Sequence, residues 1–509
     1  MFSSKKESKK KKSSRSSNTT SDGFPQLYDQ SYPFLFQEKE TAFNNNCEVL
    51  TPGQDVLNFN LQDNSYYHDP FLESNKYDKP YLDNEVEYDS LSKNLCDIDN
   101  SWFYDMLHLF KSNKYSRTVQ RDIPDGILPM GLSGTLKDIS VNARQNDDEL
   151  YMKNEDLRKF LPRGLSIINI MKNNKQFMEQ PVIFANRKFF DSDTDLDSKN
   201  IKNMTNYFLE DVIFTSKILA MEKMNGEAAH FSGRRINGQF YLVAGSKNVH
   251  MVFNSLEHIE LYTEQRYLTA RVIAKAVLAQ WRTMPASERI QFEEYLDSSR
   301  CTVVCEMMMH DRQHVVPLET CGLVVLCVTS PPCPNPTSLT AMSPEQCLRY
   351  FEKLGFDIPD YEELDLGQMR SHGTSARSKH NTEGVVYYYE NYKGETIGLL
   401  KFKSIWYTHL RALRQQASYR HRQSGKSSKS IEKSKEQARS RMEELQKWLL
   451  TSEERLESWK ELSDQWLEWL EVKADTGMLD AVSLRGNFPS VWKCFTESTE
   501  FRSNVKALL

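Results

Sequence analysis

A lysine three residues before a glycine is the first feature of this sequence that could carry out covalent chemistry. Lys223 is followed by Met224, Asn225 and Gly226, and apolar, strand-like runs lie on both sides of this segment. A tight turn between two strands would hold the ammonium at the floor of a cleft, where burial and neighbouring cations lower the pKa of a lysine and free its amine to attack. We therefore predict that Lys223 is a nucleophile with a lowered pKa. The K-x-x-G pattern alone is weak, because about one match is expected by chance in a chain of this length.

Two acids and two lysines occupy predicted strand ends further along the chain. Glu306 closes a buried strand that begins at Cys301, and a buried carboxylate needs either a salt bridge or a ligand. Glu383 opens a strand that is rich in valine and tyrosine. Lys401 and Lys403 lie two residues apart on the next strand and so project from one face of it. Their ammonium groups repel each other unless an anion lies between them; the alternative interpretation is a solvated edge strand.

Three more basic residues stand at the ends of predicted strands. Arg163 precedes an apolar strand, Lys188 follows the strand 181–184 and is succeeded by two phenylalanines, and Lys247 lies just after the strand that follows Lys223. Cations beside aromatic rings suit a phosphate-bearing ligand. The plainer interpretation is a strand end whose basic side chains extend along the surface towards water.

Two other cofactor sites are rejected on spacing. Cys301, Cys305, His310 and His314 contain C-x3-C and H-x3-H, which suggests zinc. A zinc finger, however, needs about twelve residues between its cysteine and histidine pairs, and here the second cysteine and the first histidine are nearly adjacent. A G-K-S fragment near position 425 resembles the end of a phosphate-binding loop, but it lacks the earlier glycine and the preceding strand.

The pattern predicts several further elements of the folded part. A helical stretch covers 263–297 with a break at Pro285, and Ser343 is the N-cap of another helix. Residues 371–381 are predicted to be a polar loop, and residues 232–235 a hairpin tip.

A basic and polar stretch leads into a helical C-terminal region. Two antiparallel helices are predicted there, the second opening with a capping box at Thr451. Its apolar stripe includes Trp459 and Trp466. We predict that these tryptophans belong to a packed core rather than to a platform that stacks bases.

The N-terminal part has the composition of a solvated chain. Residues 1–19 are mostly lysine and serine, and this basic arm is either a nuclear-targeting or RNA-tethering segment or a solubilising tail. Residues 20–115 carry scattered aromatic residues without a period, so we predict disorder, with a short helix near Trp102 and order from about residue 120.

Nine cysteines without short, even spacing indicate reduced thiols in an intracellular compartment. We expect no secretory signal and no membrane span.

Taken in order, four of these segments resemble the motifs of covalent nucleotidyltransferases, which read K-x-D/N-G, an acidic motif, E-G and K-x-K. They are Lys223–Gly226, Glu306, Glu383–Gly384 and Lys401–Lys403. Within that superfamily the chain resembles RNA ligases, and most of all the ligase domain of fungal-type tRNA ligases. Three more segments carry this closer resemblance, namely Arg163–Leu165 (R-G-L), Lys188–Asp191 (K-F-F-N) and Ser246–Lys247 (S-K). The resemblance covers about residues 155–410 and departs at Asp191, where that family usually has asparagine.

The resemblance implies an α+β fold in three parts. The central part, 120–410, would be a nucleotidyltransferase domain, ATP-grasp-like, with antiparallel sheets and flanking helices. An all-helical C-terminal domain would follow over 425–509 and help to hold RNA near the cleft. The region 1–115 would be disordered.

The resemblance also implies a chemistry. Lys223 would attack ATP to form lysyl-AMP, the AMP would pass to an RNA 5′-phosphate, and a 3′-hydroxyl would displace it. Glu383 would hold Mg²⁺ or Mn²⁺. The other implied nucleotide-binding residues are Gly226, Lys247, Glu306, Lys401 and Lys403, and the implied RNA-binding residues are Arg163, Lys188 and Lys247.

The expected substrate is therefore RNA with broken or spliced, tRNA-like ends, in tRNA splicing or RNA repair. A separate kinase or phosphodiesterase would prepare the ends, since the sequence contains neither a phosphate-binding loop nor paired H-x-T motifs. A nuclear or cytoplasmic location, or both, would fit this role. Two alternatives remain: a GTP-using capping-type transferase, which normally carries an OB-fold after the K-x-K strand, and a protein that binds RNA ends without catalysis.

Overall fold

The regular structure begins at Asn100. The computed structural model describes residues 100–142, 147–191, 204–423, 429–449, 451–476, 484, 486–498 and 508. The basic arm, most of the region expected to be disordered and the G-K-S fragment therefore lie outside the described residues. Helix α1 (Asn100–Ser112) confirms the helix expected near Trp102, and strand β1 starts at Ser116, so the fold begins earlier than residue 120.

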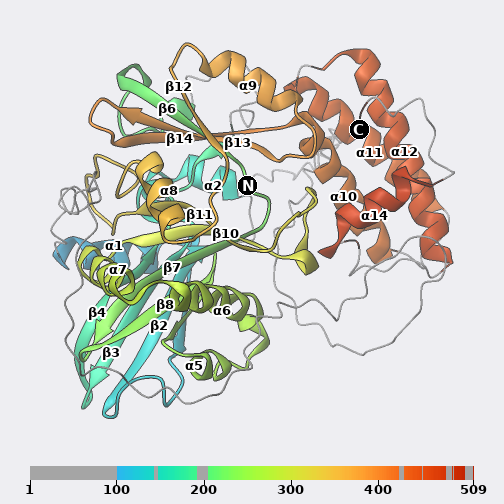
Figure 1. Cartoon of the computed structure of the whole chain (residues 1–509). Helices are drawn as coiled ribbons and strands as arrows, with labels where there is room; N and C mark the ends of the chain where they lie inside the picture. The colour runs from blue at the N-terminus through green and yellow to red at the C-terminus, as the bar shows by residue number, and fades with distance from the viewer. Residues whose placement is uncertain are drawn as a thin grey trace, which may run out of the picture.

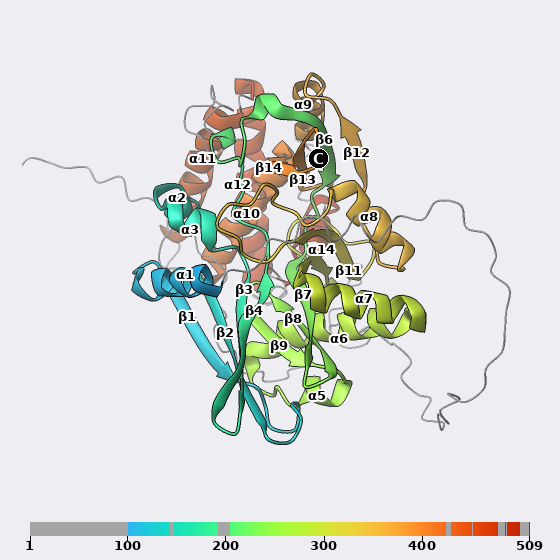
Figure 2. The same cartoon turned by 90° about the vertical axis from the view of Figure 1, so that its left-hand side faces the viewer.

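The described strands form three sheets, one of four strands and two of five. The first sheet has the order β1-β2-β3-β4 and is antiparallel throughout. Its strands are β1 (Ser116–Asp122), β2 (Leu132–Val141), β3 (Leu165–Lys172) and β4 (Lys175–Phe184). Figure 2 shows this sheet with α1 lying across the end at which β1 begins.

The second and third sheets hold the predicted chemistry. The second has the order β11-β10-β7-β8-β9 and is antiparallel. It contains β7 (Glu227–Ile236), β8 (Gln239–Ser246), β9 (Val249–Phe253), β10 (Thr302–Met308) and β11 (Gly322–Thr329). The third has the order β12-β6-β13-β14-β5, in which only the β14·β5 pair is parallel. It contains β5 (Phe190–Asp191), β6 (Thr215–Glu222), β12 (Tyr361–Leu364), β13 (Gly384–Asn391) and β14 (Thr396–Lys403).

Helices cover the outer faces of these sheets (Figure 1). They are α2 (Asp147–Lys153), α3 (Glu155–Phe160), α5 (Leu256–Glu260), α6 (Leu268–Thr283), α7 (Ala286–Ser299), α8 (Pro344–Lys353) and α9 (Met369–Ser378), with single 3₁₀ turns at Val212–Phe214, Gln265–Tyr267 and His310–Arg312. The break at Pro285 between α6 and α7 is confirmed, and so is the N-cap of α8, where the Ser343 hydroxyl accepts from the Gln346 amide. No described helix is long and apolar enough to cross a membrane.

Two local predictions were wrong. Residues 232–235 lie inside β7, and the hairpin turns instead at Asn237 and Gly238, both with positive φ, as a two-residue hairpin loop requires. The expected loop 371–381 is mostly helix α9. This helix is held by packing, because its Gly373 lies against the side chains of Tyr387 and Phe402 in the sheet below.

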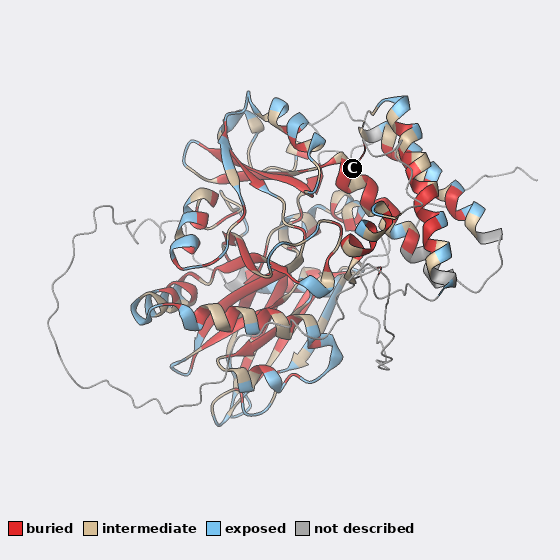
Figure 3. Ribbon diagram, turned by 45° about the vertical axis from the view of Figure 1, so that its right-hand side comes forward, coloured by how far each residue is buried: buried red, intermediate tan, exposed pale blue. Residues whose placement is uncertain are grey.

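The C-terminal part is all-helical, as predicted. Its helices are α10 (Ile405–Gln423), α11 (Lys429–Leu449), α12 (Glu453–Asp475) and α14 (Phe488–Thr496). They share one apolar core in which Trp459 and Trp466 are fully buried, which confirms the core role of both residues (Figure 3). The cap of α12 is Ser452 rather than Thr451, since the Ser452 hydroxyl accepts from the Arg455 amide.

The fold is thus α+β, with antiparallel sheets flanked by helices and an all-helical part after them, as expected from the sequence. The first two sheets and helices α5 to α8 share one large apolar core. A smaller core, which includes Leu219, Met221, Val304 and Tyr388, joins the second sheet to the third. This junction of two sheets is where Lys223 lies.

Candidate active site

Lys223 lies on a crossover between two sheets. Strand β6 of the third sheet ends at Glu222, and β7 of the second sheet begins at Glu227, so residues 223–226 pass from one sheet to the other. The tight turn expected after the first strand is thus a short connection between strands of two different sheets. The start of the crossover is fixed to the third sheet, because the Lys223 amide donates to the Gly384 carbonyl at 2.9 Å.

The other end of the crossover is fixed by Gly226 and Glu306. The Gly226 amide donates to Glu306 Oε1 at 3.1 Å. A side chain at Gly226 has no room, since an added Cβ would lie 2.5 Å from the Met307 carbonyl oxygen and 2.8 Å from Met308 Sδ. Gly226 is therefore required by the close approach of β10. Its contact with Glu306 places that carboxylate beside the lysine.

Glu383 is the direct partner of Lys223. Its Oε1 lies 2.9 Å from Lys223 Nζ, and its Oε2 accepts from Asn225 Nδ2 at 2.6 Å. The next residue, Gly384, has φ of +133° and no space for a side chain, because an added Cβ would lie 2.0 Å from the Phe402 carbonyl oxygen. A glycine after the acid thus lets β13 press against β14 and carry Glu383 to the lysine.

Asn225 holds these segments together through hydrogen bonds. The sequence identified it only as a member of the K-x-D/N-G motif and predicted no role for it. Its side chain is buried, and its Oδ1 accepts from the amides of Val315 and Val316, each at 3.1 Å. Its Nδ2 also lies 3.4 Å from the hydroxyl of Tyr407, the third residue of α10. One amide side chain therefore joins the crossover, the segment after β10 and the first helix of the C-terminal part.

The electrostatics of Lys223 differ from the expectation. Burial alone would lower the pKa of Lys223, but the carboxylates of Glu383 and Glu306 outweigh it, and the net pKa is raised. The predicted lowered pKa was wrong because the neighbours within reach are acids rather than cations. At rest the lysine is an ammonium ion.

The two acids are shifted in opposite directions. Burial would raise the pKa of Glu383, but the ammonium groups of Lys223 and Lys403 lower it overall, so the carboxylate stays charged. Burial raises the pKa of Glu306 to about 7, with Lys223 opposing the rise and Glu383 adding to it. Two acids around one lysine therefore hold different proton affinities, a pattern found where proton transfer is part of the chemistry.

Lys401 and Lys403 lie on β14 beside Asp191. The carboxylate of Asp191 is an anion that reduces the repulsion expected between the two ammonium groups. Lys403 Nζ is 2.5 Å from Asp191 Oδ2, and β5 runs parallel to β14 with Asp191 opposite Lys401. Burial, together with Lys403 and Lys188, holds the pKa of Lys401 well below its usual value. A lysine in that condition gains most from an added anion such as a phosphate. The departure from asparagine at Asp191 thus supplies a carboxylate that pairs with Lys403.

The predicted RNA-binding residues form a second cationic group around the start of α2. Lys188 is ion-paired with Asp148, and Lys247 Nζ lies 3.1 Å from Asp147 Oδ2. Burial, with Arg163 nearby, lowers the pKa of Lys247 to about 8. The group continues into the lysines of β14, because the pKa of Asp148, which burial would raise, is lowered to about 2 by Lys188 and Lys401 together.

The structure therefore brings the predicted residues into one continuous region. Lys223 and Glu383 are in direct contact, as are Gly226 and Glu306, and Lys403 of the neighbouring cationic group lies within electrostatic range of Glu383. Tyr407 was missed, since nothing in its sequence context marks it. Burial, with the carboxylate of Glu383 next, raises the pKa of Tyr407 to about 12, so its hydroxyl keeps its proton.

The rejected zinc residues are placed otherwise. Cys305 lies within β10, and Cys301 just precedes it; both thiols are buried and outside any disulfide. His314 pairs with Glu227 and with Arg414 of α10. No cluster of three or more metal-ligating side chains is found in the described part of the chain.

Residues 138–414 match the family described as "Domain of unknown function (DUF7920)", which is more than half of the chain. The chain belongs to this family. No curated protein matches it.

Two solved structures are similar in outline. One is titled "Archaeal ATP-dependent RNA ligase - form 1", with 14% identity, a TM-score of 0.40, and coverage of 74% of this chain and 81% of that one. The other is "Archaeal ATP-dependent RNA ligase - form 2", with 13% identity, a TM-score of 0.37, and coverage of 79% and 82%.

Proposed function

We propose that this protein is an ATP-dependent RNA ligase that joins a 5′-phosphate to a 3′-hydroxyl through a lysyl-AMP intermediate. The observation that carries the proposal is the arrangement around Lys223. A lysine lies 2.9 Å from one buried carboxylate and beside a second, at the junction of two sheets, with a lysine pair on the adjoining strand. Sequence motifs and geometry support the same roles.

The first step needs an unprotonated amine. The Lys223 ammonium must lose a proton, after which its nitrogen attacks the α-phosphorus of ATP. A P–N bond forms, the bond to the β-phosphate oxygen breaks, and pyrophosphate leaves with the electron pair. Glu306 suits the role of proton acceptor, because its pKa of about 7 lies near the operating pH of most enzymes.

The lysines of β14 suit the charge that develops in that step. The extra negative charge on the α-phosphate oxygens is stabilised by preorganised cations, and Lys401 and Lys403 are held in place by the sheet. The carboxylate of Asp191 beside Lys403 keeps the pair together before ATP arrives.

A divalent metal ion fits this donor set. Mg²⁺ in nucleotide enzymes uses one or two carboxylates, with phosphates and water completing its shell, and the buried, charged carboxylate of Glu383 offers one. A metal ion held by Glu383 would neutralise phosphate charge and compete with the Lys223 ammonium for the same carboxylate. We propose Glu383 as its principal protein ligand, and Mg²⁺ or Mn²⁺ as the ion.

The second and third steps transfer the AMP and seal the strand. A 5′-phosphate oxygen of RNA attacks the lysyl-AMP phosphorus, and the lysine nitrogen leaves. The 3′-hydroxyl then attacks the RNA 5′-phosphorus, a phosphodiester forms, and AMP leaves. The cationic group of Arg163, Lys188 and Lys247 is continuous with the nucleotide-binding lysines and is suited to the RNA phosphates. End-processing by separate enzymes, and a role in tRNA splicing or RNA repair, complete the proposal.

One experiment separates this proposal from its two alternatives. The protein is incubated with Mg²⁺ and either ATP or GTP labelled at the α-phosphate, and then with RNA strands bearing a 5′-phosphate and a 3′-hydroxyl. An RNA ligase forms an adduct with ATP and joins the strands. An adduct with GTP alone would point to a capping-type transferase, and binding of RNA without an adduct would point to a non-catalytic end-binding protein. Either result would overturn the proposal.

A further inference from the structure

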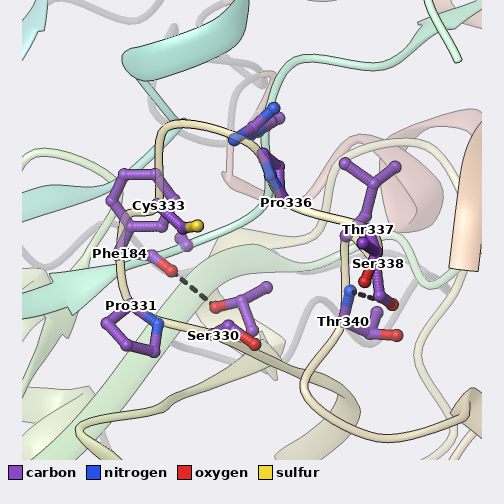
Figure 4. A pocket seen from close by; sticks show the side chains of 12 residues that line it. Phe184, Ser330, Pro331, Cys333, Pro336, Thr337, Ser338 and Thr340 are labelled. Atoms are coloured by element: carbon purple, nitrogen blue, oxygen red, sulfur yellow. Dashed lines mark hydrogen bonds between the residues drawn. The ribbon is translucent and has the colours of Figure 1, made fainter. Parts of the chain in front are cut away.

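A hollow beside the segment 185–189, which joins β4 to β5 and carries Lys188, is outside the site described above. It lies where the end of β4, the end of β11 and the segment 330–340 meet (Figure 4). Its cavity volume is about 40 Å³, where a single water needs at least about 10–15 Å³, so the hollow has room for a small group only. We refer to it as the Arg187 pocket. Its lining residues are Phe184, Ala185, Arg187, Thr329–Pro331, Cys333 and Pro336–Thr340.

Arg187 is the one charged side chain in this lining. It directly precedes Lys188, but the two differ in their partners. Lys188 is ion-paired with Asp148, whereas no hydrogen bond or ion pair joins the Arg187 guanidinium to the part of the chain that the structure describes. Burial lowers the pKa of Arg187 to about 10, so the group is still a cation at neutral pH.

A comparison with Arg234 shows what the fold normally provides for a buried arginine. The guanidinium of Arg234 is fully buried and donates to five oxygens, among them the carbonyls of Pro181, Leu296 and Arg300. The donors of Arg187 lack such acceptors among the described residues. A guanidinium held partly out of water without acceptors is unfavourable until an anion arrives.

The hydroxyl groups of the pocket divide into two sets. Three of them build the wall: Thr329 Oγ1 donates to the Phe184 carbonyl at 2.5 Å, Thr340 Oγ1 lies 2.6 Å from Thr396 Oγ1, and Ser338 Oγ accepts from the Thr396 amide at 3.0 Å. The hydroxyls of Ser330 and Thr337 form no hydrogen bond with the described residues. Two hydroxyls and one guanidinium are thus available as donors.

Two further properties favour an anion in this place. No aspartate or glutamate contributes to the lining, so nothing in it repels negative charge. Pro331 and Pro336 lie in the segment that forms the rim, and proline restricts the backbone, which reduces the entropy lost when a ligand orders a loop.

We propose that the Arg187 pocket binds a phosphate monoester, with the Arg187 guanidinium paired to the phosphate oxygens and the hydroxyls of Ser330 and Thr337 donating to them. The phosphate could be carried by the end of an RNA strand or by a small phosphorylated metabolite, since both present the same group. This site lies apart from the Lys223 cleft, and its occupancy can be measured without ATP. A failed binding test would therefore leave the ligase proposal untouched.

Cys333 provides a reporter inside the pocket. It is in no disulfide, it is partly exposed, and it lies within electrostatic range of Arg187. The full chain is treated with iodoacetamide, a neutral reagent, and alkylation is followed for each cysteine by peptide mass spectrometry. Inorganic phosphate is the first probe, with a Kd of about 1 mM expected for a single, solvent-open anion site. An anion beside the thiol covers it, so at saturating phosphate Cys333 should react at least about fivefold more slowly.

Matched controls make the result specific. Cys321 and Cys494 are also partly exposed and lie elsewhere, and their rates should not change. Arg187→Ala should abolish the protection of Cys333, while Arg266→Ala, which removes an exposed arginine from a distant 3₁₀ turn, should keep it. Thr337→Val, which removes one donor and no charge, should weaken it. The rate without phosphate shows whether each variant leaves the pocket folded.

The second probe identifies the source of the phosphate. Short RNAs of one sequence are compared, bearing a 5′-phosphate, a 3′-phosphate or hydroxyls at both ends. If a phosphorylated RNA protects Cys333 at a concentration well below that needed for free phosphate, the site is assigned to RNA ends. If free phosphate protects at the same concentration as the RNA, the site is assigned to small metabolites. Absence of protection by every probe, or protection that persists in Arg187→Ala, would overturn the proposal.

Discussion

Replacing Glu383 by glutamine should move the pH dependence of adenylylation. The ion pair between Glu383 and Lys223, at 2.9 Å, helps to raise the pKa of the lysine. Because the pKa is raised, little of the lysine is unprotonated at neutral pH. As long as the pH is below the pKa, the unprotonated fraction rises tenfold for each unit by which the pH is increased. The rate of protein–AMP formation should therefore rise with pH in the native protein.

The size of the change follows from the contact. An opposite charge within about 4–6 Å shifts a pKa by about 1–3 units, and Glu383 is closer than that, while Glu306 stays in place as a second carboxylate. In Glu383→Gln the midpoint of the pH–rate curve should fall by about one unit or more. The height of the curve should fall too, because the proposed metal ligand is lost. The midpoint is therefore the informative quantity.

The assay is single-turnover formation of the adduct with labelled ATP between about pH 7 and pH 12, a range that spans the ordinary lysine pKa of about 10.4. Glu293→Gln is a suitable control, since Glu293 pairs with Arg235 and is not among the groups that shift Lys223, Glu306 or Glu383. That variant should keep the native midpoint. If Glu383→Gln lowered the rate and left the midpoint where it was, the ion pair would not govern the lysine, and the electrostatic account would be refuted.

Three further predictions concern the supports of the site. Lys401→Ala and Lys403→Ala should each slow adduct formation by about 10²-fold at saturating ATP, whereas Lys393→Ala, an exposed lysine in the turn before β14, should have no effect; rates within a few-fold of native for all three would exclude a role in the transition state. Gly226→Ala should reduce the free energy of unfolding by about 1–3 kcal/mol in urea titrations and lower the adenylylation rate, because its Cβ would press on β10; native behaviour in both measurements would contradict the close approach. Trp459→Ala should lower the stability of the helical core by about 3–5 kcal/mol, seen as a lowered Tm in circular dichroism. It should also slow adduct formation, although Trp459 does not contact Lys223. An unaltered rate in a destabilised protein would show that α10 is not needed to hold the site.

The last of these changes an expectation from the sequence. The helices after residue 425 were assigned to RNA alone. In the structure, α10 packs in the same core as those helices, with His409 stacked on Trp459 of α12 at a ring separation of 4.2 Å, and the same helix brings Tyr407 to Asn225. Removing the later helices would therefore expose α10 and disturb the cleft. A truncation after 425 should lose adenylylation as well as sealing.

The residues that we propose for the chemistry could be picked out from the sequence because their types and order are constrained. Lys223, Glu306 and Glu383 are set by what each must do, and two glycines nearby are required by close backbone approach. The pairing of strands could not be found. Periodicity identifies strand-like runs on both sides of Lys223 but contains no information on which sheet each strand joins.

The remaining errors have the same origin in tertiary contacts. Helix α9 contains Gly373 and several serines, which are poor helix formers, and it forms because it packs on β13 and β14 and because His372 Nδ1 lies 2.5 Å from the Tyr387 hydroxyl. The pKa of Lys223 was expected to be lowered by burial and by neighbouring cations. Its direction depends on which charges are nearest, and only the folded chain shows that these are Glu383 and Glu306.

The identity of the nucleophile can be tested directly by mapping the adduct. The full-length protein is incubated with ATP and Mg²⁺, digested, and analysed by mass spectrometry for a peptide that carries AMP, with Lys223→Ala and Lys223→Arg in parallel. AMP should be found on Lys223 in the native protein, and neither variant should form an adduct, because alanine has no amine and a guanidinium stays protonated. AMP on another residue, or an adduct that persists in either variant, would contradict the assignment of Lys223 and with it the proposed mechanism.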